Sequence, residues 1–218
     1  MILAVCGGKG GVGKTTAALN LAAELGAVLV DADLGMADVP AGRGPDLHDV
    51  LAGRATAVEA VREQDAVSVL PCGRTLAGAR EADPRRVVNA LDAVASEYGD
   101  VVVDCPAGLR ADVGLPLLVA DACVLVTTPD RAALADALRA RSLAVELDAG
   151  LAAVAYNCAS DASDDVAAAL GAPVVAVPDA ACAAAAVETG RPAAALAPAT
   201  TAADRFATLA DHVRRCMQ

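Results

Sequence analysis

The sequence is poor in lysine and in aromatic side chains. Its 17 basic residues include only two lysines, Lys9 and Lys14, which lie in one glycine-rich segment. Tryptophan is absent, and two tyrosines and one phenylalanine are the only aromatic residues. With 28 acidic residues, the net charge is −11. Non-specific DNA binding depends on clustered lysine and arginine, so this balance argues against direct DNA binding.

Long apolar runs are also missing. No stretch of about 20 apolar residues free of charge occurs, so no transmembrane helix is expected. The chain enters a strand-like segment at once, without the positively charged region that is typical of a signal peptide. We therefore expect a cytoplasmic protein.

The seven cysteines are odd in number and are never spaced as Cys-x-x-Cys. Several of them, including Cys6, Cys123 and Cys158, are assigned to predicted strands. We interpret them as buried free thiols, which behave as small hydrophobic side chains. Disulfides or a metal site are the alternatives.

The composition also suggests a hypothesis about the source. Arginine replaces lysine, alanine and valine are abundant, and the acidic residues are in excess. These features are typical of a GC-rich genome and of a salt-rich cytoplasm, which favours a haloarchaeal source. An acidic protein from a mesophile with a GC-rich genome is the alternative.

Apolar, β-branched runs alternate with helical stretches along almost the whole chain. Such runs are typical of strands buried on both faces of a parallel sheet. The sequence therefore predicts an α/β fold, a mostly parallel sheet covered by helices on both faces, in a single domain over residues 1–218. The predicted strands are 2–6, 27–30, 67–70, 101–103, 123–127, 151–156 and 174–177. The predicted helices are 15–25, 46–52, 56–62, 84–98, 132–147, 164–170, 180–189 and 201–215.

The glycine-rich segment has the spacing of a phosphate-binding loop. It fits the pattern G-x-x-x-x-G-K-[ST] and lies between a predicted strand and a predicted helix. Glycines let backbone N–H groups converge on an anion, and the helix N-terminus adds partial positive charge. Lys14 is expected to reach the β- and γ-phosphates of ATP, and the Thr15 hydroxyl to reach Mg²⁺. A glycine-rich turn with a chance lysine is the alternative. The loop residues expected to contact the nucleotide are Gly8, Lys9, Gly10, Gly11, Val12, Gly13, Lys14, Thr15 and Thr16.

Three carboxylates follow predicted strands. Asp31 and Asp33 come after one strand, and Asp104 comes after another. Ligands of open parallel sheets bind beyond the carboxyl ends of the strands, so these side chains are expected near the loop. Asp104 is of the type that holds Mg²⁺, usually through a water molecule. A turn or helix cap is the alternative for each aspartate taken singly.

Taken together, these motifs resemble the MinD/ParA family of P-loop ATPases with a deviant Walker A motif, in its MinD branch. Residues 9–16 read Lys-Gly-Gly-Val-Gly-Lys-Thr-Thr, and residues 31–38 are similar to the family's first switch. Residues 104–108, Asp-Cys-Pro-Ala-Gly, resemble the second switch. Residues 126–130 are similar to the family's strand-end Val-Thr-x-Pro-Glu. The resemblance extends from residue 2 to about residue 213.

The resemblance implies an ATPase that forms a homodimer when ATP is bound and that controls an unidentified protein partner. Lys9 matches the signature lysine, which crosses to the phosphates of the other subunit. Asp33 matches the residue that orients the attacking water, and Asp31 matches a Mg²⁺-shell or structural position. Thr16 is expected to contact the α-phosphate. Adenine contacts are implied for Asn157, Pro178 and Asp179.

The chain departs from the family pattern at several positions. Asp38 stands where the first switch commonly has asparagine, and Cys72 and Cys105 stand where small residues are usual. Near the C-terminus, Phe206, Leu209 and Val213 recur at helical spacing. We interpret that helix as part of the core and expect no autonomous membrane binding. An interfacial membrane helix is the alternative.

Three other functions are the alternatives. A metallochaperone or cofactor-maturation ATPase of the same superfamily would need paired cysteines, and no Cys-x-x-Cys occurs. A ParA-type DNA-partitioning ATPase would need a basic surface stripe. A binding protein without hydrolysis is disfavoured because Lys9, Lys14, Asp33 and Asp104 are all present.

Overall fold

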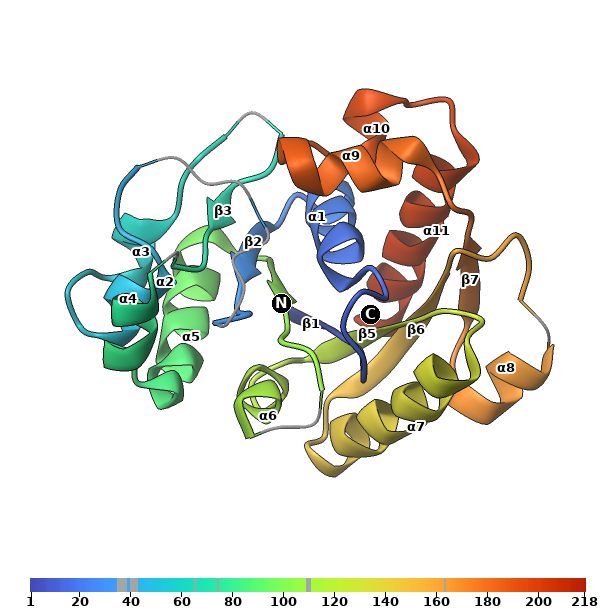
Figure 1. The fold of residues 1–218 in the computed structure, drawn as a ribbon, viewed down its shortest axis with the longest axis horizontal. Helices are drawn as coiled ribbons and strands as arrows, with labels where there is room; N and C mark the ends of the chain where they lie inside the picture. The colour runs from blue at the N-terminus through green and yellow to red at the C-terminus, as the bar shows by residue number, and fades with distance from the viewer. Residues whose placement is uncertain (35–38, 40–42, 65, 74, 109–110, 163) are drawn as a thin grey trace.

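The structure is a computed structural model that describes residues 1–34, 39, 43–64, 66–73, 75–108, 111–162 and 164–218. In this part of the chain, seven strands form one sheet in the order β3-β2-β4-β1-β5-β6-β7, and all neighbours are parallel (Figure 1). The strands are β1 (Ile2–Cys6), β2 (Val28–Asp31), β3 (Val69–Leu70), β4 (Val101–Asp104), β5 (Ala122–Thr127), β6 (Gly150–Asn157) and β7 (Val174–Val177). The predicted α/β class and parallel sheet are confirmed.

Helices connect the strands. They are α1 (Lys14–Leu25), α2 (Leu47–Leu51), α3 (Ala57–Ala60), α4 (Leu76–Glu81), the 3-10 helix η1 (Pro84–Arg86), α5 (Val87–Tyr98), α6 (Ala111–Leu117), α7 (Arg131–Glu146), α8 (Asp164–Leu170), α9 (Ala181–Thr189), α10 (Ala193–Leu196) and α11 (Thr201–Cys216). Each predicted helix is present, with ends shifted by a few residues. The helices α4, α6 and α10 were not predicted.

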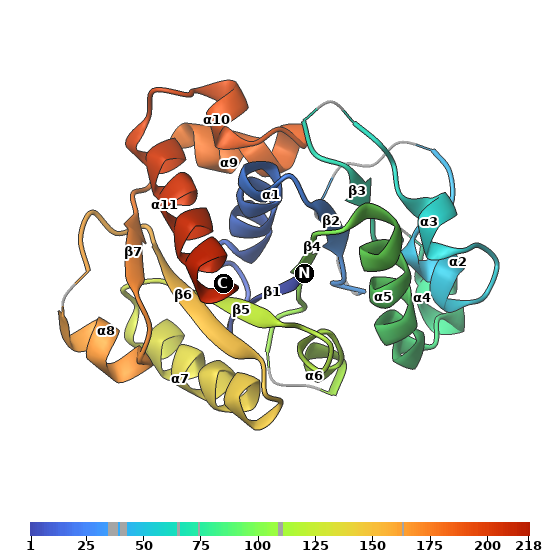
Figure 2. The same ribbon diagram turned by 180° about the vertical axis from the view of Figure 1, so that it is seen from behind.

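Two apolar layers enclose the sheet. Alternate residues of each strand point to opposite faces, so Leu3 and Val5 join one core while Ala4 and Cys6 join the other. The first core is closed by α1, α9, α10 and α11, and the second by α2, α3, α5, α6, α7 and α8. Figures 1 and 2 show these two groups of helices on opposite sides of the sheet. Burial on both faces explains the unbroken apolar strands of the sequence.

The helix α11 packs on the sheet. Phe206, Leu209 and Val213 are all buried in the first core, together with residues of α1. The interpretation of this helix as a core element is therefore confirmed. No helix among the residues described here has the length and apolar character needed to cross a membrane.

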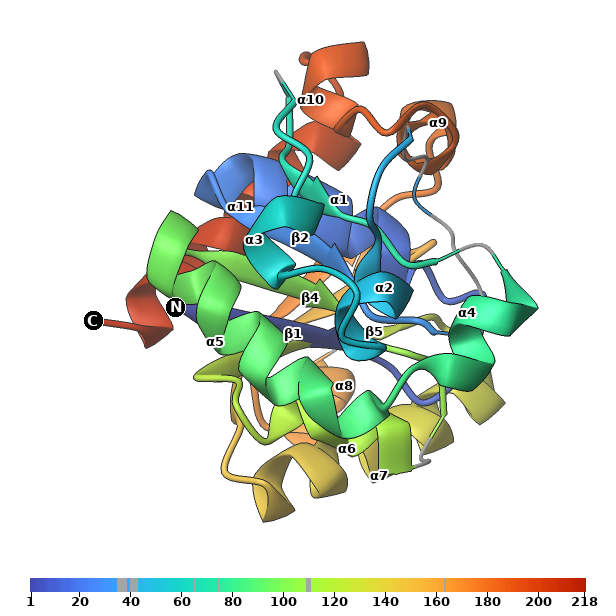
Figure 3. The ribbon, with the colours of Figure 1, turned by 90° about the vertical axis from the view of Figure 1, so that its left-hand side faces the viewer.

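The connections place the end of β1 at a switch point of the topology. From β1 the chain passes through α1 to β2 on one side, whereas from β4 it passes through α6 to β5 on the other side. Open α/β sheets bind ligands at such a point, beyond the carboxyl ends of the strands. Both chain ends lie at the opposite edge, where the strands begin (Figure 3).

Candidate nucleotide-binding site

The glycine-rich loop joins β1 to α1, as predicted. Gly11 and Gly13 have φ angles of 75° and 97°, a left-handed conformation that glycine adopts without steric cost. Gly8 is needed for a different reason, because a β-carbon there would lie 2.3 Å from the carbonyl oxygen of Asp136 on α7. The loop thus packs closely against α7 and bends sharply into α1.

The first turn of α1 is suited to an anion. Gly13 stands at the N-cap position and offers no side chain to the backbone N–H groups that follow. The helix has 12 residues, and its N-terminus carries about half a unit of positive charge. Helix N-termini of this kind bind phosphate. Thr15 and Thr16 lie in this turn and are half-buried.

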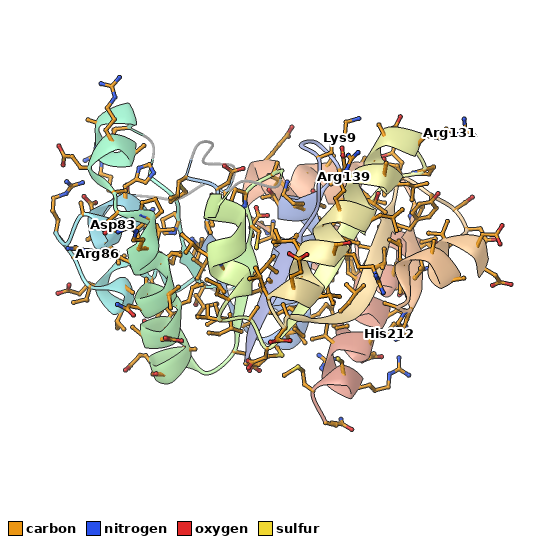
Figure 4. All side chains as sticks on the ribbon, turned by 90° about the horizontal axis from the view of Figure 1, so that it is seen from below. Lys9, Asp83, Arg86, Arg131, Arg139 and His212 are labelled. Atoms are coloured by element: carbon orange, nitrogen blue, oxygen red, sulfur yellow. The ribbon has the colours of Figure 1, made fainter. Side chains whose placement is uncertain are left out.

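The two lysines occupy different environments. Lys14 is the first residue of α1 and is only 8% exposed, so its ammonium group lies inside the site. The Lys9 side chain is 49% exposed, and its Nζ lies 3.6 Å from Oδ1 of Asp130. Figure 4 shows Lys9 on the upper side of the view, with His212 of α11 on the lower side. The loop therefore directs one ammonium inward and one outward.

Asp130 was not singled out as a functional residue in the sequence. It caps α7 by accepting a hydrogen bond from the backbone N–H of Ala133 at 2.9 Å. This hydrogen bond and the charge of Lys9 lower the pKa of Asp130. Its place three residues after the end of β5 was the available signal, because strand ends gather at the site.

The strand-end carboxylates come together as predicted. Asp31 and Asp104 are register partners on β2 and β4, and Asp104 is also level with Val5 of β1. Both side chains are buried. Asp33 is half-buried, and its backbone N–H donates to Oδ1 of Asp31 at 3.3 Å. The site thus combines a buried ammonium with buried carboxylates.

Asn157, Pro178 and Asp179 are brought together at the next strands. Asn157 ends β6 beside Val177 of β7, and Pro178 and Asp179 follow directly. Nδ2 of Asn157 donates to the carbonyl oxygen of Val12 at 2.9 Å. This contact with the loop was not predicted. The adenine contacts of these residues stay a prediction.

The cysteines follow the prediction only in part. All seven are free thiols, and Cys6, Cys72, Cys105 and Cys123 are buried as expected. Cys158 is exposed, because β6 ends one residue before it and the chain turns there with a φ of 56°. Its assignment to a buried strand is therefore wrong. No cluster of three His, Cys, Asp or Glu side chains arranged to hold a metal was found within the described part of the chain.

Asp38, the departure in the first switch, lies outside the described residues. So does the segment 35–37 that precedes it. The described part of this switch ends at Leu34, directly after Asp33.

Comparison with known proteins identifies the family. A sequence model of an AAA domain matches residues 1–139. An uncharacterized ATP-binding protein of Methanocaldococcus jannaschii is 33% identical over 168 residues, which cover 72% of this chain and 64% of that protein. The septum site-determining protein MinD of Bacillus subtilis is 32% identical over 152 residues, which cover 63% of this chain and 56% of that protein. The chain thus spans between about half and two thirds of the length of these curated relatives.

A solved structure extends the likeness over the whole fold. The septum site-determining protein MinD of Pyrococcus horikoshii, complexed with Mg-ADP, matches with a TM-score of 0.91 at 26% identity. The match covers 99% of this chain and 96% of that one. Because the domain model spans more than half of the sequence and a MinD structure follows the fold almost from end to end, the chain belongs to the MinD/ParA family of P-loop ATPases.

Proposed function

We propose that this protein binds ATP with Mg²⁺ at the loop after β1 and dimerises with a second copy of itself while ATP is bound. Hydrolysis to ADP and phosphate would release the dimer, so the nucleotide state would set whether a partner protein is recruited or positioned. One observation carries the proposal. Lys14, the buried first residue of α1, lies at the same edge of the sheet as the buried carboxylates of Asp31 and Asp104.

The donor groups suit a nucleotide with its metal. The backbone N–H groups of the loop and the ammonium of Lys14 would bind the phosphates, and Thr16 would contact the α-phosphate. The Thr15 hydroxyl and the carboxylates of Asp31 and Asp104 are oxygen ligands of the kind that Mg²⁺ prefers. Bound Mg²⁺ neutralises phosphate charge and fixes the orientation of the phosphates. Asn157, Pro178 and Asp179 would surround the base.

Asp33 and Lys9 would supply the chemistry of hydrolysis. The Asp33 carboxylate would orient the attacking water, and its backbone is held by Asp31. Lys9 would reach the phosphates bound by the other subunit and offset the charge that develops during phosphoryl transfer. Lys9 forms an ion pair with Asp130 in which both side chains are exposed. Exposed ion pairs are screened by water and contribute little, so the ammonium can exchange this carboxylate for a phosphate.

The remaining expectations stand as predictions. We propose a cytoplasmic protein that acts through a protein partner. We expect neither direct DNA binding nor autonomous membrane binding. The net charge of −11 supports both expectations, because DNA and anionic lipid headgroups repel an acidic surface.

The two lysines provide a matched experiment, because the same substitution can be made twice in one loop. Lys14→Ala should abolish Mg-ATP binding in calorimetry, since it removes the buried cation. Lys9→Ala should keep ATP affinity within about three-fold, since its ammonium points out of the site, but should lose ATP hydrolysis. Undiminished ATP affinity in Lys14→Ala would refute the assignment of the site.

A second variant tests the role of Asp33. Asp33→Asn should bind ATP normally but hydrolyse it slowly, because the neutral amide lacks the negative charge with which the carboxylate would orient the water. Size-exclusion chromatography with ATP in high salt should then show a persistent dimer. Turnover at the wild-type rate would contradict the proposed role.

A further inference from the structure

Two side chains outside the predicted site hold the backbone that follows Asp33. Nε2 of His48, on α2, lies 3.2 Å from the carbonyl oxygen of Leu34. Sγ of Cys72, just after β3, lies 3.2 Å from the carbonyl oxygen of Asp33. The two side chains also meet each other, with 3.7 Å between Sγ and Nε2. Both are buried.

The chemistry of these contacts fixes the direction of both hydrogen bonds. A backbone carbonyl only accepts, so Nε2 of His48 must carry a proton and donate it. Burial, together with the charge of Asp31, raises the pKa of the Cys72 thiol. The thiol therefore keeps its proton and donates to the Asp33 carbonyl. Two donors thus act on two consecutive carbonyl groups.

The surroundings of His48 are shaped for its imidazole ring. A β-carbon at Gly73 would lie 2.0 Å from Nδ1, and one at Gly78 would lie 3.1 Å from Nδ1. Neither glycine has a positive φ angle. Space for the ring, rather than backbone conformation, therefore explains glycine at these two positions. Nδ1 has no hydrogen-bond partner among the described residues.

The element that carries His48 is itself anchored. Asp46 and Asp49 form a capping box at the start of α2. The backbone N–H of Leu47 donates to the carbonyl of Pro71 at 2.9 Å, which ties α2 to the end of β3. His48 and Cys72 therefore act from fixed positions on the turn that they hold.

We propose that His48 and Cys72 are positioning residues for Asp33 in ATP hydrolysis; this inference rests on the proposed function. The backbone around Asp33 is held at three points: its N–H by Asp31, its carbonyl by Cys72, and the next carbonyl by His48. These bonds set where the Asp33 carboxylate points. Misplacement of a catalytic group by about 1 Å can lower the rate on the order of 100-fold. Loss of either donor should therefore slow hydrolysis without weakening ATP binding.

Paired variants separate the hydrogen bond from packing. His48→Leu and Cys72→Ala remove the donors. His48→Gln keeps a side-chain N–H near the position of Nε2, and Cys72→Ser keeps a hydroxyl near Sγ. We expect kcat for ATP to fall roughly ten-fold or more in His48→Leu and Cys72→Ala. Affinity for a fluorescent ATP analogue should stay within about three-fold. His48→Gln and Cys72→Ser should recover most of kcat.

A double-mutant comparison tests whether the effect passes through Asp33. Once Asp33→Asn has removed the carboxylate, adding Cys72→Ala should slow hydrolysis no further. Cys72→Ala deletes one sulfur atom and tests the inference if His48→Leu does not fold. A merely structural role would instead lower the melting temperature, reduce kcat and ATP affinity together, and add to the effect of Asp33→Asn.

The outcomes distinguish this inference from the proposed function. If the wild-type protein neither binds nor hydrolyses ATP, the proposed function fails and the inference fails with it. If the wild-type protein hydrolyses ATP but kcat is unchanged in Cys72→Ala and His48→Leu, only the inference is overturned. A fall in kcat that the donor-retaining variants do not reverse would also overturn it.

Discussion

Replacing Gly8 by alanine would place a methyl group against the backbone of α7. The added β-carbon would lie 2.3 Å from the carbonyl oxygen of Asp136 and 2.5 Å from its carbonyl carbon. Ordinary van der Waals contact begins at 3.4 Å, so the loop and α7 must separate by about 1 Å. Since α7 is a regular helix of 16 residues, we expect the loop to move.

The displacement would carry the loop N–H groups away from the phosphates. A hydrogen bond to a charged group contributes about 1.5–3 kcal/mol, so losing one would weaken ATP binding roughly 10- to 150-fold. Overpacking should also lower the free energy of unfolding by about 1–3 kcal/mol. Gly8 does not have a positive φ angle, so its backbone conformation would not by itself disfavour alanine. Both effects therefore follow from the steric conflict with α7.

Calorimetry with Mg-ATP and a urea unfolding curve measure the two effects of Gly8→Ala. Gly150→Ala is the matched control, since a β-carbon there would meet its nearest neighbour, the carbonyl oxygen of Asp121, at an ordinary 3.7 Å. The control should keep wild-type affinity and stability. Wild-type ATP affinity in Gly8→Ala would refute the reasoning, because the methyl group cannot fit without moving the loop.

Three further predictions concern the burial of α11, membrane binding and the region next to Asn157. Phe206→Ala should lower the free energy of unfolding by about 3–5 kcal/mol in urea denaturation, because the ring is buried in the core. The wild-type protein should not co-sediment with anionic liposomes in the presence of ATP, and co-sedimentation lost in a folded variant without α11 would contradict this. Bound ATP should slow labelling of the exposed Cys158 by a thiol reagent, with the exposed Cys216 as the internal control. Equal labelling of Cys158 with and without ATP would argue against a base pocket beside Asn157.

The fold was predictable where periodicity and local chemistry agree. The apolar runs of β1 and β7 indicate buried strands, and the predicted first and last residues of both strands agree with the structure. The helix α4 contains Gly78, and α6 contains Gly114 and Pro116. Glycine and proline lower helix propensity, so packing rather than local preference decides these two segments. Whether residues 1–218 form a single domain stays a prediction.

The candidate site was predictable only in its local parts. Lys14 follows from its loop, and Asp31 and Asp104 follow from the ends of strands that a parallel sheet gathers at one edge. The contact of Asn157 with Val12 joins residues 145 positions apart. The bond from His48 to Leu34 depends on where α2 packs. Such contacts are set by tertiary structure, and a single sequence carries no pattern for them.

The most direct measurement mixes two hydrolysis-deficient variants, Lys9→Ala and Asp33→Asn, and follows ATP hydrolysis. If Lys9 acts across a dimer, the mixed dimer contains one complete site, made of Asp33 from one subunit and Lys9 from the other. An equal mixture should then recover roughly one quarter of wild-type activity, because half of the dimers are mixed and each has one working site. Each variant alone should keep only a low residual rate. If the wild-type protein hydrolyses ATP but the mixture hydrolyses it no faster than the separate variants, the proposed ATP-dependent dimer is contradicted.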